Sequence, residues 1–185
     1  MTHKHKRYAY KVSLLTLITF TTVCFANICL AVDGYKKLKF GSSVKQILKN
    51  KPCSLSKLKM GDKLVTAYTC QDFIFGGKNV EAIAYFINGK FLRFGILVDT
   101  ESTPALVQGL TEKYGVPSSS SGTQSFQVVD QRPNTEAFVA YDADTIYLKI
   151  MTDANMNQSV LLLYTSPKFD QIRQLKEKKS LQSDL

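Results

Sequence analysis

Two carboxylates that could form a catalytic pair, Asp142 and Asp144, stand two residues apart in the segment "YDADT". Paired carboxylates serve as general acid and general base in many hydrolases. The segment separates two strand-like runs, however, and an Asp-rich turn explains the same residues. We therefore predict a protein without catalytic residues. A carboxylate-dependent hydrolase remains an alternative function, and acidic residues converging in one pocket would favour it.

A second acidic segment, "DANMNQSVLLLY", places Asp153, Asn155 and Asn157 at the spacing of a calcium-binding loop. Such a loop needs a glycine at its sixth position and a bidentate glutamate at its twelfth. This chain has Gln158 and Tyr164 there. A hairpin loop between two strands accounts for the segment, so we predict no metal site and no cofactor.

The N-terminal residues 1–31 are typical of a secretory signal peptide, with a basic start and the apolar run "VSLLTLITFTTVCFANICLA". Cleavage is expected after Ala31, with Ala26 as a second position. This leaves residues 32–185 as one exported domain in the periplasm or outside the cell. The apolar run is also about as long as the shortest bilayer-spanning stretches, so a leader retained as an anchor is the alternative.

Removal of this leader would change the chemistry open to the protein. It takes four basic and no acidic residues, so the formal charge falls from +9 to about +5, with 20 basic against 15 acidic side chains. It also takes both histidines, His3 and His5. Nucleophilic catalysis of the Ser/His/Asp or Cys/His type and histidine-based zinc sites are thereby excluded.

Cys53 and Cys70 would be the two cysteines left after cleavage. An even number of cysteines in an exported chain favours a disulfide. This one would close a loop of about 16 residues and stabilise the fold by about 3 kcal/mol. A redox-active pair would need closer spacing, so we predict a structural role.

Lysines are concentrated near the start of the exported part. Nine lie within residues 36–63, against the single acid Asp62: Lys36, Lys37, Lys39, Lys45, Lys49, Lys51, Lys57, Lys59 and Lys63. They form either a solvated face or a patch that contacts an anionic membrane surface or an acidic partner. Nucleic acid is not an expected partner, because the leader directs the chain out of the cytoplasm and no arginine–aromatic patch is present.

Two aromatic residues, Phe73 and Phe75, follow the second cysteine and precede a Gly-Gly turn. Such residues are usually part of a core. Aromatic anchors also dominate protein interfaces, however. Phe73 and Phe75, with Lys57 and Lys59, are therefore the candidate partner-binding residues.

Local patterns in the first half predict one helix and an antiparallel hairpin. Ser42 or Ser43 can cap a short helix that Pro52 stops. Residues 63–70 have strand composition, and Asn88-Gly89 is the pair preferred in a two-residue type I′ turn. After this turn, alternation puts one set of apolar side chains on a common face: Leu92, Phe94, Ile96 and Val98.

The second half predicts a similar succession. A helix over residues 103–114 starts with Thr103 as its cap, and the "SSSSG" segment at 118–122 is expected to be a flexible loop. Strands are expected at 125–129, 136–141, 145–151 and 159–165. A last helix over 167–179 would bury three apolar side chains, namely Phe169, Ile172 and Leu175.

This order predicts an α+β fold in which an antiparallel sheet carries its helices on one face. A helix followed by an antiparallel meander occurs twice, which indicates two tandem αβββ units with candidate halves at 35–100 and 101–180. The helix stripes and the alternating strands would bury a single core between the two layers.

The opening residues Phe40-Gly41-Ser42-Ser43-Val44, with Ile47, Leu48 and Pro52, resemble the start of small envelope domains. These domains are grouped as BamE/SmpA-like and beta-lactamase-inhibitor-like, and the tandem αβββ order is also similar to the latter. The resemblance implies a non-enzymatic protein that assists outer-membrane assembly or binds a partner through a sheet face. The chain departs from the pattern at Asn50, where a glycine is usual, and it lacks an evident lipidated cysteine.

The sequence therefore predicts an exported, non-enzymatic binding protein of the bacterial periplasm or cell envelope. Its partner would be a protein or another envelope component. A membrane-tethered subunit of an envelope or secretion complex is the alternative if the leader is retained.

Overall fold

The structure is a computed structural model that describes residues 31–183. The predicted leader, residues 1–31, lies outside this range except for its last residue, Ala31. Among the residues that are described, no helix is both long enough and apolar enough to cross a membrane.

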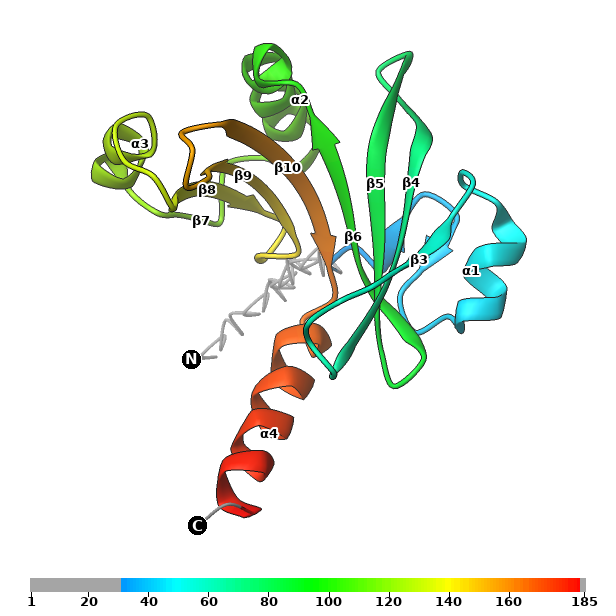
Figure 1. The fold of residues 1–185 in the computed structure, drawn as a ribbon. Helices are drawn as coiled ribbons and strands as arrows, with labels where there is room; N and C mark the ends of the chain where they lie inside the picture. The colour runs from blue at the N-terminus through cyan, green and yellow to red at the C-terminus, as the bar shows by residue number, and fades with distance from the viewer. Residues whose placement is uncertain (1–30, 184–185) are drawn as a thin grey trace, which may run out of the picture.

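An eight-stranded antiparallel sheet forms the body of the protein, in the order β3-β4-β5-β6-β10-β9-β8-β7 (Figure 1). Its strands are β3 (Ser56–Leu58), β4 (Val65–Phe75), β5 (Lys78–Ile87), β6 (Lys90–Val98), β7 (Ser119–Ser120), β8 (Thr135–Tyr141), β9 (Ile146–Thr152) and β10 (Gln158–Thr165). The other elements are β1 (Gly34–Tyr35), β2 (Leu38–Lys39), α1 (Val44–Asn50), the 3₁₀-helix η1 (Thr100–Ser102), α2 (Thr103–Tyr114), α3 (Thr123–Val129) and α4 (Lys168–Ser183). The predicted α+β class with an antiparallel sheet is confirmed.

The sheet consists of two groups of strands that meet in its middle. The first group, β3 to β6, follows α1, and the second group, β7 to β10, follows α2. The last long strand of each group lies at the junction, where β6 pairs with β10 and Ile96 faces Leu162. Helix and meander therefore occur twice in succession, with α3 inserted into the second group.

One face of the sheet, here called the covered face, carries the main core. Because neighbouring residues of a strand point to opposite faces, Phe94 and Tyr164 share this face with Ile96 and Leu162. The short β1–β2 hairpin covers it through Tyr35, whose ring lies 5.2 Å from that of Phe94. α1 and α2 pack on the same core through Ile47 and Leu110, and α3 lies on this side, where Val129 accepts a hydrogen bond from Thr152.

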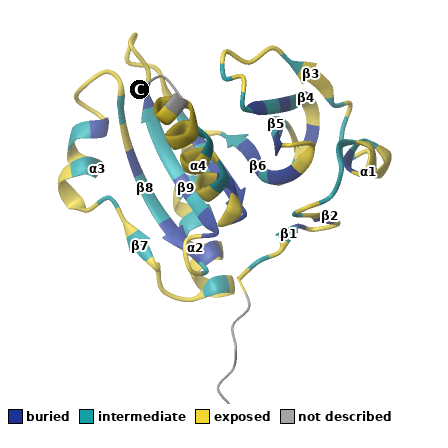
Figure 2. Cartoon of the chain, turned by 90° about the horizontal axis from the view of Figure 1, so that it is seen from below, coloured by how far each residue is buried: buried dark blue, intermediate teal, exposed yellow. Residues whose placement is uncertain are grey.

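The opposite face, here called the open face, carries α4 at one end and no other helix of the described chain (Figure 2). Phe169 of α4 packs in a separate small cluster with Val65, Ile87 and Leu92. The expectation that all helices share one face is therefore wrong for α4. The predicted burial of Leu175 is also wrong, because this side chain is 60% exposed.

The β5–β6 hairpin has the predicted turn, with φ values of 52° and 70° at Asn88 and Gly89. A register shift between Tyr85 and Phe86 adds one residue to β6 next to the turn. The shift turns Phe91 into the main core and Leu92 towards α4. This corrects the predicted face for these two residues, since a bulge reverses the alternation locally.

The segments that follow α2 differ from the prediction. Residues 125–129 belong to α3 and are not a strand, because a short apolar run fits either state and Val129 is buried as part of a helix. Ser119–Ser120 of the expected flexible loop pairs with β8 as an edge strand. Thr103 is the first residue of α2 rather than its cap, and its buried hydroxyl has no hydrogen-bond partner among the described residues.

Ser43 and Asp99 cap two of the helical segments in the described residues. Ser43, one of the two serines predicted as the cap, caps α1 and forms a reciprocal capping box with Gln46. Asp99 caps η1, where its carboxylate accepts hydrogen bonds from Ser102 and from Lys78. These two interactions, with Ser102 the stronger, lower the pKa of Asp99 to about 2.

The predicted disulfide between Cys53 and Cys70 is present, with a Cα–Cα distance of 6.2 Å. It joins the segment after α1 to the middle of β4, next to the main core. The bridge therefore holds the α1 segment against the first group of strands.

Candidate functional site

The two groups of strands curve towards each other on the open face and form a concavity, here called the trough. In Figure 2, β8 and β9 stand on one side and β4 to β6 on the other, with α4 between them. A cavity of about 200 Å³ lies in the trough. Its lining comes from both groups and from α4: Met60, Asp62, Val65, Tyr85, Arg93, Lys149, Met151, Leu161, Leu163, Phe169 and Arg173.

Gly95 lies in the middle of the trough, on β6. A β-carbon at this position would be 3.1 Å from Cδ1 of Leu161 and 3.7 Å from Cε2 of Tyr85. The side chains of the two strand groups therefore close over the glycine backbone. A larger residue would push Leu161 outwards and change the floor of the trough.

Aromatic and charged side chains alternate along the second group. The Phe138 and Tyr147 rings are 5.5 Å apart, and Lys149 pairs with Glu136 at 3.2 Å. Burial raises the pKa of Tyr147 and, on the facing strand group, that of Tyr85. Both phenols are therefore neutral near pH 7 and can donate and accept hydrogen bonds.

Arg93 joins the trough to α4. Its Nε donates to Oγ1 of Thr165 at 2.9 Å, its Nη2 donates to Asp170 at 2.7 Å, and its guanidinium carbon lies 3.7 Å from the Phe169 ring centroid. Burial lowers the pKa of Arg93, and the Asp170 carboxylate opposes that shift. Arginine remains charged at neutral pH, so Arg93 keeps its ion pair with Asp170 and holds α4 on the sheet at the end of the trough.

The predicted partner-binding residues are separated in the structure. Phe73 is 5% exposed and packs in the main core, so it is not available to a partner. Phe75 is half-buried beside a cleft on the covered face. Lys57 and Lys59 lie near the opposite end of β4, because Lys57 of β3 pairs with Tyr68. Their charges protect the short edge strand against pairing with another chain.

The predicted acidic segments are turns, and their carboxylates do not converge. Asp142 accepts the backbone N–H of Val32 at 2.5 Å and the Thr145 hydroxyl at 2.7 Å. Asp144 accepts the hydroxyls of two serines in the β7 segment. Asp153 accepts two backbone N–H groups of the β9–β10 loop, as expected for a hairpin loop. Each of these carboxylates is thus engaged in hydrogen bonds with its own turn or with the segment beside it.

Asp72 lies close to the two cysteine sulfurs, a combination that could hold a metal ion if the thiols were free. Both sulfurs belong to the disulfide, so they cannot act as thiolate ligands. The Asp72 carboxylate instead accepts hydrogen bonds from Ser54, which lower its pKa. The arrangement is a structural cap on the segment after Cys53.

Sequence reasoning missed the residues of the trough. Tyr85, Tyr147 and Leu161 are visible as outward positions of alternating strands. The sequence does not show, however, that among residues 31–183 α4 covers only one end of their face. The exposed side chain beside Phe75 is Ile74, which is 59% exposed and was also missed.

Comparison with known proteins places the chain among proteins without an assigned activity. A family model described as "Uncharacterised protein" matches residues 35–184. A protein of Haemophilus influenzae (strain ATCC 51907 / DSM 11121 / KW20 / Rd), described as "Uncharacterized protein", is 30% identical over 175 residues. The match covers 94% of this chain and 96% of that protein. No solved structure matches the chain.

Proposed function

The chain belongs to this family of uncharacterised proteins, and we propose that it is an exported, non-enzymatic binding protein that holds a partner protein in the trough. The proposal rests on the uncovered inner face of the sheet, where Tyr85, Met151 and Leu161 remain partly exposed. Tyrosine, methionine and arginine are enriched at protein interfaces relative to the rest of the surface, whereas lysine, glutamate and aspartate are depleted there.

The size of the surface favours a protein over a small molecule. The cavity of about 200 Å³ is smaller than typical ligand pockets of about 300–1,000 Å³. Further partly exposed side chains extend the same face across both strand groups, namely Ile83, Leu97, Phe138 and Tyr147. A loop or helix of a partner could therefore enter the trough while its flanks contact the neighbouring strands.

A binding role is favoured over catalysis by the charges of the trough. Asp62 pairs with Arg173 at 3.6 Å and Glu136 with Lys149 at 3.2 Å. A general acid or base must have its carboxyl free to face a substrate, whereas both of these carboxylates are engaged by a cation. The resemblance of the opening motif to envelope domains that bind partners through a sheet face supports the same function.

Export to the periplasm or to the outside of the cell is supported by the disulfide, since such bonds persist in oxidising compartments. A leader retained as an anchor would make the protein a tethered subunit with the same trough. Contact of the lysine-rich segment 36–63 with an anionic membrane surface remains a prediction.

The proposal can be tested by photocrosslinking in the native host. The photoreactive amino acid p-benzoylphenylalanine is placed at Met151 in the trough and, as a control, at Gln108 on the exposed side of α2. We expect one adduct of defined mass at position 151 and none at 108. Intact mass of the purified protein, with and without reductant, identifies the processed N-terminus in the same preparation.

A second variant links the adduct to the surface. Leu161→Glu places a charge on the trough floor and should abolish the adduct at position 151, whereas Gln108→Glu should leave it unchanged. Far-UV circular dichroism of both variants shows whether they fold. Equal adducts at both positions, or an adduct that survives Leu161→Glu in a folded protein, would contradict a partner in the trough.

A further inference from the structure

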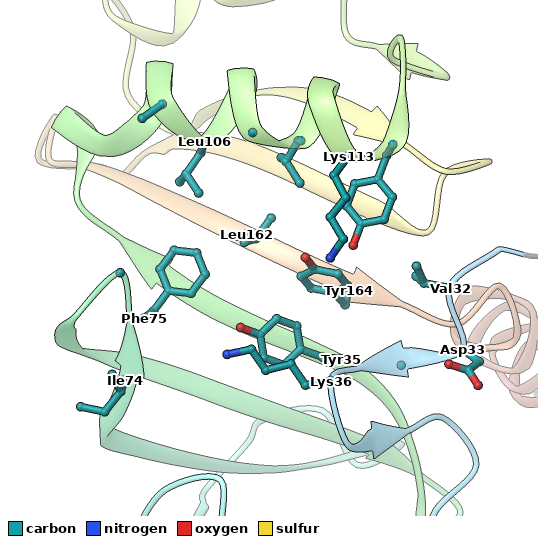
Figure 3. Close-up of a pocket in the computed structure, with 16 residues that line it drawn as sticks. Val32, Asp33, Tyr35, Lys36, Ile74, Phe75, Leu106, Lys113, Leu162 and Tyr164 are labelled. Carbon is teal, nitrogen blue, oxygen red and sulfur yellow. The ribbon is translucent and has the colours of Figure 1, made fainter.

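The covered face contains a second concavity, which lies between α2 and the β1–β2 hairpin and is here called the cleft (Figure 3). Its volume is about 570 Å³, within the range of about 300–1,000 Å³ typical of ligand sites. Leu162 and Tyr164 of β10 form its floor. Leu106 and Leu110 of α2 form one wall, and Phe75 lies on the other side.

The cleft is open because α2 presents small residues to it. Ala105 and Gly109 lie on the α2 wall, and a β-carbon added to Gly109 would have no heavy atom within 4 Å. Larger residues at these two positions would close the gap between α2 and the hairpin. The floor beneath is apolar, because Leu162 belongs to the main core.

Three tyrosines line the cleft, namely Tyr35, Tyr114 and Tyr164. The Tyr35 and Tyr164 rings are 4.8 Å apart, and Tyr164 is hydrogen-bonded to Tyr114. Burial raises the pKa of Tyr164, and the hydrogen bond with Tyr114 raises it further. Burial also raises the pKa of Tyr35. These phenols therefore remain protonated at neutral pH and can donate hydrogen bonds to an acceptor.

Two ammonium groups lie at the same site. Lys113 Nζ is 4.9 Å from the Tyr114 ring centroid and Lys36 Nζ is 5.4 Å from that of Tyr35. Neither lysine forms an ion pair within residues 31–183, whereas Asp33, the one acid in the lining, pairs with Lys39 at 2.6 Å. Figure 3 shows Lys113 and Tyr164 pointing towards one another from the wall and the floor.

We propose that the cleft binds a single-chain amphiphile with an anionic headgroup, a carboxylate or a phosphate. The tail would lie on Leu106, Leu162 and Phe75, and the headgroup would accept hydrogen bonds from the tyrosine hydroxyls beside Lys36 and Lys113. An apolar lining with two unpaired cations and phenolic donors is complementary to this class of molecule. The cleft is on the opposite face from the trough, so the inference does not depend on the proposed function.

Isothermal titration calorimetry of the purified protein with dodecanoate, below its micelle concentration, is the direct test. We expect 1:1 binding that tightens about fourfold for each methylene added from octanoate to dodecanoate, because each buried CH₂ contributes a fixed increment. Dodecyl phosphate should bind similarly. Dodecanol and dodecyltrimethylammonium should bind at least tenfold more weakly, since the first lacks the charge and the second reverses it.

Two matched pairs of variants locate the site. Gly109→Leu adds a side chain where a β-carbon has open space and should abolish binding, while Gln108→Leu on the exposed side of α2 should not. Lys36→Gln/Lys113→Gln should weaken dodecanoate at least tenfold and leave dodecanol unchanged, while Lys45→Gln/Lys178→Gln should leave both unchanged. Thermal melts followed by circular dichroism verify that each variant folds.

Several results would overturn the proposal. Dodecanol binding as tightly as dodecanoate would remove the role of the cations, and undiminished binding to folded Gly109→Leu would place the ligand elsewhere. Titration with phosphatidylglycerol vesicles separates a free amphiphile from a membrane. Binding to vesicles but to no monomeric amphiphile would contradict an occupied cleft and favour a basic surface patch instead.

Discussion

Replacement of Arg93 by methionine tests whether one buried cation holds α4 on the sheet. The Arg93 side chain is 18% exposed and its partner Asp170 is 58% exposed. Methionine is close in length, so the apolar stem contacts of arginine are largely preserved. The variant therefore removes the stacking on Phe169 and the bonds to Thr165 and Asp170.

The size of the effect follows from the three contacts. A desolvated cation–π contact contributes about 2 kcal/mol, and a hydrogen bond from a charged donor contributes about 1.5–3 kcal/mol. An ion pair with an exposed carboxylate contributes about 0–1 kcal/mol. These contributions are not additive in full, so we expect Arg93→Met to lower the free energy of unfolding by about 3 kcal/mol. Asp170→Asn should lower it by about 1 kcal/mol or less.

Urea unfolding followed by far-UV circular dichroism measures these differences, because the chain contains no tryptophan for fluorescence. Hydrogen exchange gives a local readout, in which Arg93→Met should reduce protection in α4 before it affects β9. If Asp170→Asn lowered the free energy of unfolding as much as Arg93→Met does, the stabilisation would come from the ion pair. That result would refute its assignment to the stacking on Phe169 and the hydrogen bond to Thr165. Unchanged hydrogen exchange in α4 of Arg93→Met would refute the conclusion that Arg93 holds this helix on the sheet.

Three further predictions concern the frame around the two concavities. Cys53→Ala/Cys70→Ala should destabilise the protein by about 3 kcal/mol in urea, and reductant should then have no further effect on the variant. Asp99, with its pKa of about 2, stabilises the native state above its unfolded pKa of about 4, and this stability is lost as the pH falls towards 2; acid unfolding of Asp99→Asn should lack that component. If the leader is cleaved after Ala31, the Val32 nitrogen that donates to Asp142 becomes an ammonium group. Hydrogen bonds to charged groups are stronger, so Asp142→Asn should then destabilise the processed chain by about 1 kcal/mol more than the unprocessed chain. Thermal melts of the two forms measure this difference.

Local features were predictable because few residues determine them. The Ser43 cap, the Asn88-Gly89 turn and the Cys53–Cys70 bridge each depend on residue types at fixed short spacings. The α+β class followed from the order of helical and alternating segments. Such short patterns predict single helices, turns and residue pairs, and the structure contains this cap, this turn and this disulfide.

Features that depend on distant packing were not predictable in the same way. Alternation shows that Leu161 and Leu163 share a face, but it does not show which helix, if any, covers that face. The register shift in β6 exchanges Phe91 and Leu92 between the faces, and no residue type marks it. Leu175 fits the apolar stripe of α4, yet it is 60% exposed, whereas Phe169 at the start of the helix is buried against the sheet.

The candidate site was only partly predictable for the same reason. Phe73 and Phe75 were both predicted as candidate partner-binding residues, but Phe73 is buried in the core, while Phe75 lies at the core's edge and lines the cleft, so its binding role stays a prediction. The tyrosines of the cleft come from β1, α2 and β10, so no sequence window contains them together. The role of Gly109 was not predicted, because a glycine within a helix is normally interpreted as lowering helix stability and not as leaving space for a cleft.

Strand β10 separates the two proposals physically. Leu161 and Leu163 face the trough while Leu162 forms the floor of the cleft, so successive residues of one strand line opposite concavities. A substitution at Leu161 changes the trough floor and leaves the lining of the cleft in place, and Gly109→Leu does the reverse. Loss of the crosslinked adduct with retained dodecanoate binding would therefore assign the partner to the trough alone, and the opposite result would assign the amphiphile to the cleft alone. A variant that removed both activities while folded would indicate that the two faces change shape together through β10, which the separate linings do not predict.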